Sequence, residues 1–269
     1  MSIAADAATQ SAGRPFLELP ITTIPSRKSV IMSNIDLKEV EKFEQLADRW
    51  WDPQGEFRPL HDMNPLRLDF IQTQAAGLAG KQVLDVGTGG GILAESMARS
   101  GAKVMGIDLG EAPLAVAALR AQQAQLAIDY RKIAAEDLAA TDANRFDVVT
   151  CMEVLEHVPD PASTIAACAA LVKPDGHVFF ATINRNLKSY LLAIVGAEYL
   201  LGMLPRGTHD YARFIKPSQM LHWAEAAALQ ARLFKGMAYH PLTREFSLVN
   251  DVSVNYLGHF LKGQAKGQR

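Results

Sequence analysis

A carboxylate and a run of glycines lie close together in the segment VLDVGTGGG, residues 83–91. The apolar residues before the glycines predict a buried strand, and the ILAE sequence after them predicts the start of a helix. Backbone N–H groups in a glycine turn at a helix N-terminus can bind a small anionic group, as in dinucleotide-binding proteins. A dinucleotide site uses the spacing G-x-G-x-x-G, however, and Ile92 stands where the third glycine would fall. The segment therefore predicts a ligand-binding turn but disfavours a dinucleotide.

Asp85 narrows the choice of ligand because it lies two residues before the first glycine of the turn. Its negative charge would repel the pyrophosphate of NAD. S-adenosylmethionine (SAM) carries an ammonium and a sulfonium group and no phosphate, so an acidic side chain beside the turn favours it. These residues predict a methyl-transfer enzyme in which Asp85 faces the SAM ammonium, directly or through water. Gly87 and Gly89 would let the backbone approach the methionine part of this donor.

Further donor-binding candidates follow the next two predicted strands, because ligands of open α/β sheets lie beyond the carboxyl ends of the strands. Asp108 ends the strand predicted over 103–108, about 20 residues after the glycine turn, where an acid accepts hydrogen bonds from ribose hydroxyls. Glu136 and Asp137 follow the third strand, and either could accept a hydrogen bond from the adenine amino group. The sequence does not decide between them, since a solvated helix N-cap suits both residues equally well.

Strands and helices are predicted to alternate from residue 82 onward. The predicted strands are 82–87, 103–108, 128–134, 146–151, 177–182, 230–239 and 252–261, and the predicted helices are 90–100, 111–125, 160–172 and 217–228. Such alternation builds an α/β fold with a mostly parallel, Rossmann-like sheet and helices on both faces. The last two of these seven strands follow each other without a long helix between them, which predicts an antiparallel pair at the sheet edge.

Two helices are predicted before the first strand. Apolar residues recur at three and four positions through 36–51, which is typical of an amphipathic helix, and the DPQG sequence at 52–55 ends it. Asn64 and Pro65 are predicted to start a second helix that runs to about Ala76, with the proline in its first turn. We therefore divide the chain into a helical cap at 34–78 and a methyltransferase domain at 79–269, which carries an insertion at about 184–217. Residues 1–33 are rich in Ala, Ser, Thr and Pro without periodicity and predict a disordered extension, so Met32 is a second candidate translation start.

Composition narrows the class of protein. The 269 residues carry a formal net charge of −2, which gives no support to a nucleic-acid partner. The two cysteines, Cys151 and Cys168, fit a reducing compartment without a disulfide framework and are predicted as small core residues. No apolar run reaches the roughly 20 residues that a membrane-spanning helix needs, and the N-terminus lacks the features of a signal peptide. A cytoplasmic location is the expectation that follows.

Several short motifs narrow the prediction further. They are WWDP at 50–53, GEF at 55–57, PLH at 59–61, NPLR at 64–67, VTCME at 149–153, LEHVPDP at 155–161, NRN at 184–186, VGAEY at 195–199, GTHD at 207–210 and FIKP at 214–217. With these motifs the chain resembles the ubiquinone-biosynthesis O-methyltransferases from about Ile35 to Leu261. The double tryptophan and the segment after the fifth strand are far more specific than the glycine turn, which identifies only the superfamily.

The resemblance implies a class I methyltransferase fold and an enzyme that methylates ring hydroxyls of polyprenylated catechol or hydroquinone intermediates at two steps of the quinone pathway. It also implies donor contacts by Arg67, Gly87, Asp108 and Met152, with the guanidinium binding the donor carboxylate in a fork and Met152 packing on adenine. Thr88 departs from the family, which commonly has Cys there, but the backbone is expected to bind at this position. The alternative is a class I methyltransferase that acts on another small molecule.

Glu153, Glu156 and His157 are the candidates for acceptor chemistry. A catechol hydroxyl is mostly protonated near neutral pH, because its pKa resembles the value of roughly 10 for Tyr, and a base or a metal ion can help to ionise it. If the segment is helical, the three side chains lie on one face at i, i+3 and i+4 and could hold Mg²⁺ or another divalent cation. The resemblance supports this interpretation, since some family members depend on a metal attributed to the triplet. The competing interpretation makes His157 a general base, and the sequence leaves both open.

Apolar stretches at 190–195 and 199–204 lie between the basic residues Arg185, Lys188 and Arg206. A short apolar helix edged with basic residues can lie in a membrane interface, which would suit a substrate with a polyprenyl tail. A lid packed on the active site explains the same pattern equally well. The sequence thus predicts either a lid or a peripheral contact of 188–204, with the cytoplasmic face of the inner membrane or with other proteins of the pathway.

Overall fold

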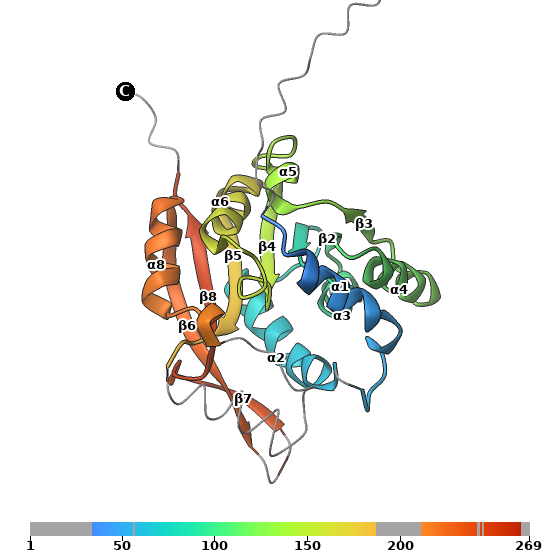
Figure 1. Ribbon diagram of the computed structural model, residues 1–269. Helices are drawn as coiled ribbons and strands as arrows, with labels where there is room; N and C mark the ends of the chain where they lie inside the picture. Colours follow the sequence, from blue (N-terminus) through green and yellow to red (C-terminus); the bar gives the residue numbers. More distant parts are fainter. Residues whose placement is uncertain (1–33, 56, 187–210, 241–242, 244, 265–269) are drawn as a thin grey trace, which may run out of the picture. The chain divides into compact units, whose positions relative to one another are not determined.

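Within the residues that the computed structural model describes (34–55, 57–186, 211–240, 243 and 245–264), eight strands form one mixed sheet in the order β3-β2-β1-β4-β5-β8-β6-β7 (Figure 1). The strands are β1 (Gln82–Val86), β2 (Lys103–Asp108), β3 (Asp129–Lys132), β4 (Phe146–Met152), β5 (Val172–Ile183), β6 (Leu229–His240), β7 (Glu245–Val249) and β8 (Asn255–Lys262). The first five strands run parallel to one another, whereas β8 is antiparallel to both β5 and β6, and β7 is antiparallel to β6. The predicted α/β, Rossmann-like architecture is confirmed.

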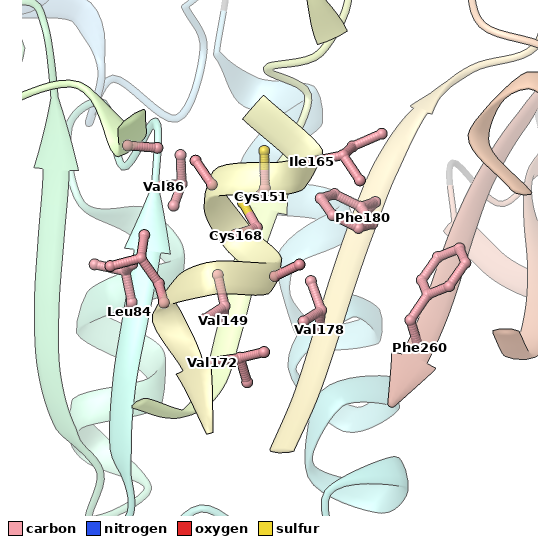
Figure 2. Close-up of a cluster of buried hydrophobic side chains, with 14 of the residues drawn as sticks. Leu84, Val86, Val149, Cys151, Ile165, Cys168, Val172, Val178, Phe180 and Phe260 are labelled. Carbon is pink, nitrogen blue, oxygen red and sulfur yellow. The ribbon is translucent and has the colours of Figure 1, made fainter. Parts of the chain in front are cut away.

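Helices cover both faces of this sheet. They are α1 (Leu37–Gln45), η1 (Ala47–Arg49), α2 (Arg58–Gln74), α3 (Ile92–Arg99), α4 (Glu111–Gln123), α5 (Ala135–Ala139), α6 (Pro161–Leu171), η3 (Tyr211–Arg213) and α8 (Pro217–Ala226). Leu84 packs on one face with residues of α5, α6 and α8, in a cluster where Figure 2 shows the buried Cys151 and Cys168. The preceding residue, Val83, packs on the other face with residues of α2 and α3. Successive strand residues thus enter opposite clusters, as a sheet covered on both sides requires.

In the carboxyl-terminal part of the sheet, two predictions are wrong: the edge position of β8 and the number of strands. The segment predicted as an edge strand, β8, lies inside the sheet between β5 and β6, where Tyr256, Leu257 and Phe260 are fully buried. A strand that is apolar on both faces gains more burial between two neighbours than at an edge. The edge is formed by the short, partly exposed β7, which the sequence analysis missed, so the predicted seven strands are one too few for the described residues.

The N-terminal helices also differ from their predicted bounds. Asp36 caps α1, because its carboxylate accepts hydrogen bonds from the backbone N–H groups of Lys38 and Glu39, and the helix stops at Gln45 before a 3₁₀ turn. The predicted start of α2 at Asn64 is wrong. This helix begins at Arg58, and Pro65 lies inside it, where the missing N–H removes one helical hydrogen bond. The short α5 after β3 was not predicted.

Two predicted segments lie outside the described residues. These are the N-terminal extension at 1–33 and most of the insertion, including the stretch 188–204 for which a lid or a membrane contact is predicted. In the described part of the chain, no helix combines the length and apolar character that crossing a bilayer requires.

A pair of histidines, the buried His259 and the half-buried His177, links β5 and β8. His177 Nδ1 lies 3.0 Å from His259 Nε2, and the His259 ring stacks on Phe179 with ring centroids 4.7 Å apart. Burial lowers the pKa of His259 to about 4, and repulsion from His177 and Arg232 adds to this effect. The neutral form of His259 is therefore the one that the folded protein accommodates.

Acid is expected to destabilise the fold through His259. The unfolded chain binds a proton at this residue near pH 6.5, so its contribution to stability is complete above that pH and is lost as the pH falls toward 4. We expect the His259→Phe protein to lose about 2–3 kcal/mol less free energy of unfolding between pH 7 and 4.5 than the wild type, measured with urea. The exposed His222 is the control, because His222→Gln should keep the wild-type dependence. An unchanged dependence in His259→Phe would contradict the prediction.

Candidate active site

A cavity of about 540 Å³ lies at the carboxyl ends of β1, β2 and β4, with α1 and the first turns of α2 forming part of its wall. All candidates for donor binding and acceptor chemistry except Asp137 line it: Arg67, Asp85, Gly87, Gly89, Asp108, Glu136, Met152, Glu153, Glu156 and His157. The parallel sheet brings most of them together, because the ends of its strands meet at one edge. Asp137 is exposed and is not part of the described wall, so of the two adenine candidates the geometry favours Glu136.

The glycine turn is packed against protein side chains. Gly87 and Gly89 have φ angles of 67° and 51°, which glycine adopts without strain. A Cβ atom at Gly87 would collide with Val154, and one at Gly89 would collide with the indole ring of Trp50. Trp50 itself stacks on Phe57 with ring centroids 4.0 Å apart. Glycine is therefore needed here for the approach of these side chains, a role of the double tryptophan that the sequence analysis missed.

Asp85 is buried in the cavity wall and bonded to two hydroxyl groups. Its two carboxylate oxygens accept hydrogen bonds from the hydroxyls of Thr150 (2.7 Å) and Thr88 (2.8 Å), and the residue is only 3% exposed. Burial raises its pKa to about 6, although both hydroxyls oppose the shift. Thr88 thus acts through its side chain as well as its backbone, since its hydroxyl bonds the acid of the turn. Thr150 could have been suspected, because its side chain occurs in an otherwise apolar strand.

Asp108 joins the second strand to the glycine turn. Its Oδ2 accepts a hydrogen bond from the Gly89 N–H and its Oδ1 accepts one from the Gly110 N–H, both at 2.8 Å. Burial raises the pKa of Asp108, and these backbone hydrogen bonds oppose the shift. The carboxylate keeps lone pairs for further donors, because each of its oxygens can accept two hydrogen bonds. Its position at the end of β2 agrees with the prediction.

Glu136 is held by neighbours from the start of the cap and from α6. Its Oε1 accepts hydrogen bonds from Asn34 (2.9 Å), Thr164 (3.0 Å) and Ser163 (3.2 Å). Asn34 also donates to the backbone carbonyl of Asp160, so it ties the start of the cap to the N-terminus of α6. This fixed carboxylate presents a hydrogen-bond acceptor in the cavity wall.

Arg67 and two glutamates form a charged cluster in the cavity wall. Arg67 is 5% exposed, and its guanidinium lies 2.5 Å from Glu153 Oε1, while its Nε has no partner among the described residues. Glu156 is buried and accepts a hydrogen bond from the Thr182 hydroxyl at 2.9 Å. Burial, followed by the charge of Glu153, raises the pKa of Glu156 well above its usual value. The two acids thus differ: Glu153 pairs with a cation, and Glu156 favours its neutral form.

Residues 153–157 form a turn and not a helix, so the predicted common face of Glu153, Glu156 and His157 is wrong. Glu153 starts the turn with a φ of 55°, which costs a non-glycine residue about 1 kcal/mol. Each side chain has its own partner: Glu153 pairs with Arg67, Glu156 bonds a hydroxyl of β5, and His157 Nδ1 lies 2.9 Å from Glu39 Oε2. In the part of the chain that the structure describes, no three His, Cys, Asp or Glu side chains are grouped to hold a metal ion. As arranged, these residues do not fit the predicted Mg²⁺.

Sequence comparisons find a family and close relatives. The family described as "Methyltransferase domain" matches residues 59–232. A ubiquinone biosynthesis O-methyltransferase of Acinetobacter baumannii (strain SDF) is 61% identical over 85% of this chain and 97% of its own length. Relatives with the same name from Hahella chejuensis and Ralstonia nicotianae are 61% and 62% identical, over 86% and 84% of this chain and 97% and 94% of their own lengths.

Solved structures of methyltransferases share the fold. The crystal structure of magnesium protoporphyrin IX methyltransferase from Synechocystis PCC 6803 with bound SAH has a TM-score of 0.63 and 18% identity, covering 85% of this chain and 100% of that one. The same protein with bound SAM has a TM-score of 0.58 and 16% identity, covering 86% and 100%. At these identities the likeness establishes the arrangement of strands and helices, and the acceptor must be argued from the cavity itself.

Proposed function

The chain belongs to the ubiquinone biosynthesis O-methyltransferases, and from this membership we propose which acceptor it takes and how the cavity prepares it. The protein is a SAM-dependent O-methyltransferase of ubiquinone biosynthesis with a class I, Rossmann-like fold. Its proposed acceptors are ring hydroxyls of polyprenylated catechol or hydroquinone intermediates, at both O-methylation steps of the pathway.

The donor half of the cavity is proposed to hold SAM. The unpaired Nε of the buried Arg67 supports this fit, because a guanidinium with a free N–H can bind the donor carboxylate. Asp108 offers free lone pairs to the ribose hydroxyls, Glu136 offers an acceptor to the adenine amino group, and Met152 offers an apolar surface to the adenine ring. When bound, SAM supplies an electrophilic methyl group and leaves as a neutral thioether.

The acceptor half is proposed to lie beside Glu153, Glu156 and His157, which line the same cavity. We assign His157 the removal of the ring-hydroxyl proton through Nε2, so that the oxygen attacks as the methyl group is transferred. The Phe43 side chain lines this region and meets the His157 ring edge to face, at a centroid distance of 5.2 Å. Such an aromatic wall suits a flat phenolic ring and helps to exclude water.

A single observation carries this proposal: the donor-type residues and the Glu153–His157 turn line one continuous cavity. Methyl transfer is an in-line displacement, so donor and acceptor must lie side by side, which a shared cavity permits. The test is an assay of the purified chain with labelled SAM and a short-chain prenyl catechol. We expect label in the O-methylated catechol. Binding of SAM without transfer to any prenyl catechol or hydroquinone would overturn the proposed acceptor and favour another small molecule.

We also propose a peripheral membrane contact for the segment 188–204, which rests on its sequence pattern of apolar stretches beside basic residues. Flotation with liposomes tests it by comparing the full chain with a form that lacks 188–204. More of the full chain should float, and equal recovery of both forms in the soluble fraction would reject the contact.

A further inference from the structure

Helix α1 brings an acid into contact with the imidazole of the active-site turn. Glu39, in the first turn of α1, places its Oε2 2.9 Å from Nδ1 of His157, 118 residues away in sequence. Both side chains line the cavity, and they are 24% and 18% exposed. The ring of Phe43, one helical turn further along α1, packs against the same imidazole. One face of α1 thus holds His157 by a hydrogen bond and by an aromatic contact.

The charge state of Glu39 fixes the direction of this hydrogen bond. The pKa of Glu39 is lowered, mainly by the hydrogen bond with His157, so the carboxylate is favoured. A carboxylate only accepts hydrogen bonds, and therefore Nδ1 of His157 must carry the hydrogen. In the neutral imidazole Nε2 then bears the lone pair, and it is the ring nitrogen that Glu39 does not engage.

We propose that Glu39 is a positioning residue for methyl transfer: it holds the His157 ring in one orientation and in the Nδ1–H tautomer, so that Nε2 can take the acceptor proton. This inference rests on the proposed function, because the proton belongs to the ring hydroxyl. The carboxylate also stabilises the imidazolium that forms as the proton arrives. A side chain of the cap therefore contributes to chemistry that the sequence analysis assigned wholly to the turn at 153–157.

A purely structural role for Glu39 can be distinguished from the positioning role, because other residues also attach α1 to the rest of the protein. Glu44 accepts hydrogen bonds from the backbone N–H groups of Glu111 (2.5 Å) and Ala112 (3.1 Å) and so caps α4. Asp36 pairs with Arg213 at 2.7 Å. Glu44 lies on the same helix as Glu39 but is not part of the described cavity wall. A change at Glu44 thus weakens docking of α1 without touching His157.

The test compares Glu39→Ala and Glu39→Gln with Glu44→Ala in the prenyl-catechol assay. For Glu39→Ala we expect kcat to fall by about 100-fold, within the range for general-base catalysis, with the KM for SAM unchanged within about twofold. Glu39→Gln should recover part of kcat, because its amide oxygen can still accept the bond from Nδ1. Glu44→Ala should keep kcat within about twofold of the wild type while lowering the free energy of unfolding by about 1 kcal/mol through the lost cap.

Nitrogen-15 NMR of histidine-labelled protein gives the spectroscopic readout, with the His157 signal assigned by its absence in His157→Asn. The wild type should show the Nδ1–H tautomer, and Glu39→Ala should shift toward the Nε2–H tautomer. Equal losses of kcat in Glu39→Ala and Glu44→Ala, or an unchanged tautomer in Glu39→Ala, would overturn the positioning role. Failure of the wild type to methylate the catechol would instead overturn the proposed function, so the two failures are distinguishable.

Discussion

Replacing Asp108 by alanine is expected to weaken SAM binding by about 100-fold or more, measured by calorimetry. The carboxylate is the acceptor proposed for the ribose hydroxyls, and hydrogen bonds to a charged group contribute about 1.5–3 kcal/mol each. The substitution also leaves the N–H groups of Gly89 and Gly110 without their acceptor, so the glycine turn itself loses support. Both effects act on the donor side, and we therefore expect loss of binding rather than a change in kcat alone.

Asp129 provides the matched control for this experiment. It lies on the neighbouring strand β3, is exposed, and pairs with Arg131 at the surface, so Asp129→Ala should bind SAM like the wild type. The conservative Asp108→Asn keeps one oxygen acceptor and should fall between alanine and wild type. Titration of the wild type with NAD completes the series. Binding of NAD together with undiminished SAM binding by Asp108→Ala would contradict the proposed donor site.

Glutamine substitutions at Glu153 and Glu156 are expected to have very different effects. Glu153→Gln removes the negative charge that pairs with the buried Arg67. Removing one partner of a buried ion pair destabilises a protein by about 3–5 kcal/mol, because the other charge is left uncompensated. We expect kcat/KM to fall by about 100-fold or more. Glu156 favours its neutral form, which glutamine imitates in shape and hydrogen bonding, including the bond from Thr182. Glu156→Gln should therefore lower kcat/KM by no more than about threefold.

The expected difference between Glu153→Gln and Glu156→Gln also distinguishes the two interpretations of Glu153, Glu156 and His157. One interpretation is that they bind a metal ion, and the other is that His157 is a general base. Two carboxylates that ligate one cation would each be essential, so both substitutions would damage the enzyme alike and EDTA would inhibit the wild type. Steady-state kinetics of the two variants and of their double mutant, with and without EDTA, make the comparison. Equal losses of kcat/KM in the two variants, together with inhibition by EDTA, would contradict the arrangement derived from the structure and would support a metal site.

Patterns along single segments were sufficient to predict the two strands whose ends border the proposed donor half of the cavity. The strand before Gly87 and the strand that ends at Asp108 are both short apolar runs whose bounds in the structure lie within one residue of prediction. Once such strands pair in parallel, their carboxyl ends must meet at one edge. The position of β8 was harder to predict, because the sequence shows that it pairs with β6 but not that β5 lies on its other side.

The sequence by itself determined the class of fold, the family and the candidate residues at the strand ends that line part of the cavity, because these depend on local periodicity and on motifs of adjacent residues. The tertiary structure decided which partner each side chain has. Trp50 lies on Gly89, Arg67 pairs with Glu153, and Glu39 bonds His157 across 118 residues. Such contacts arise only when the cap folds onto the sheet, and burial there sets charge states that no local pattern contains.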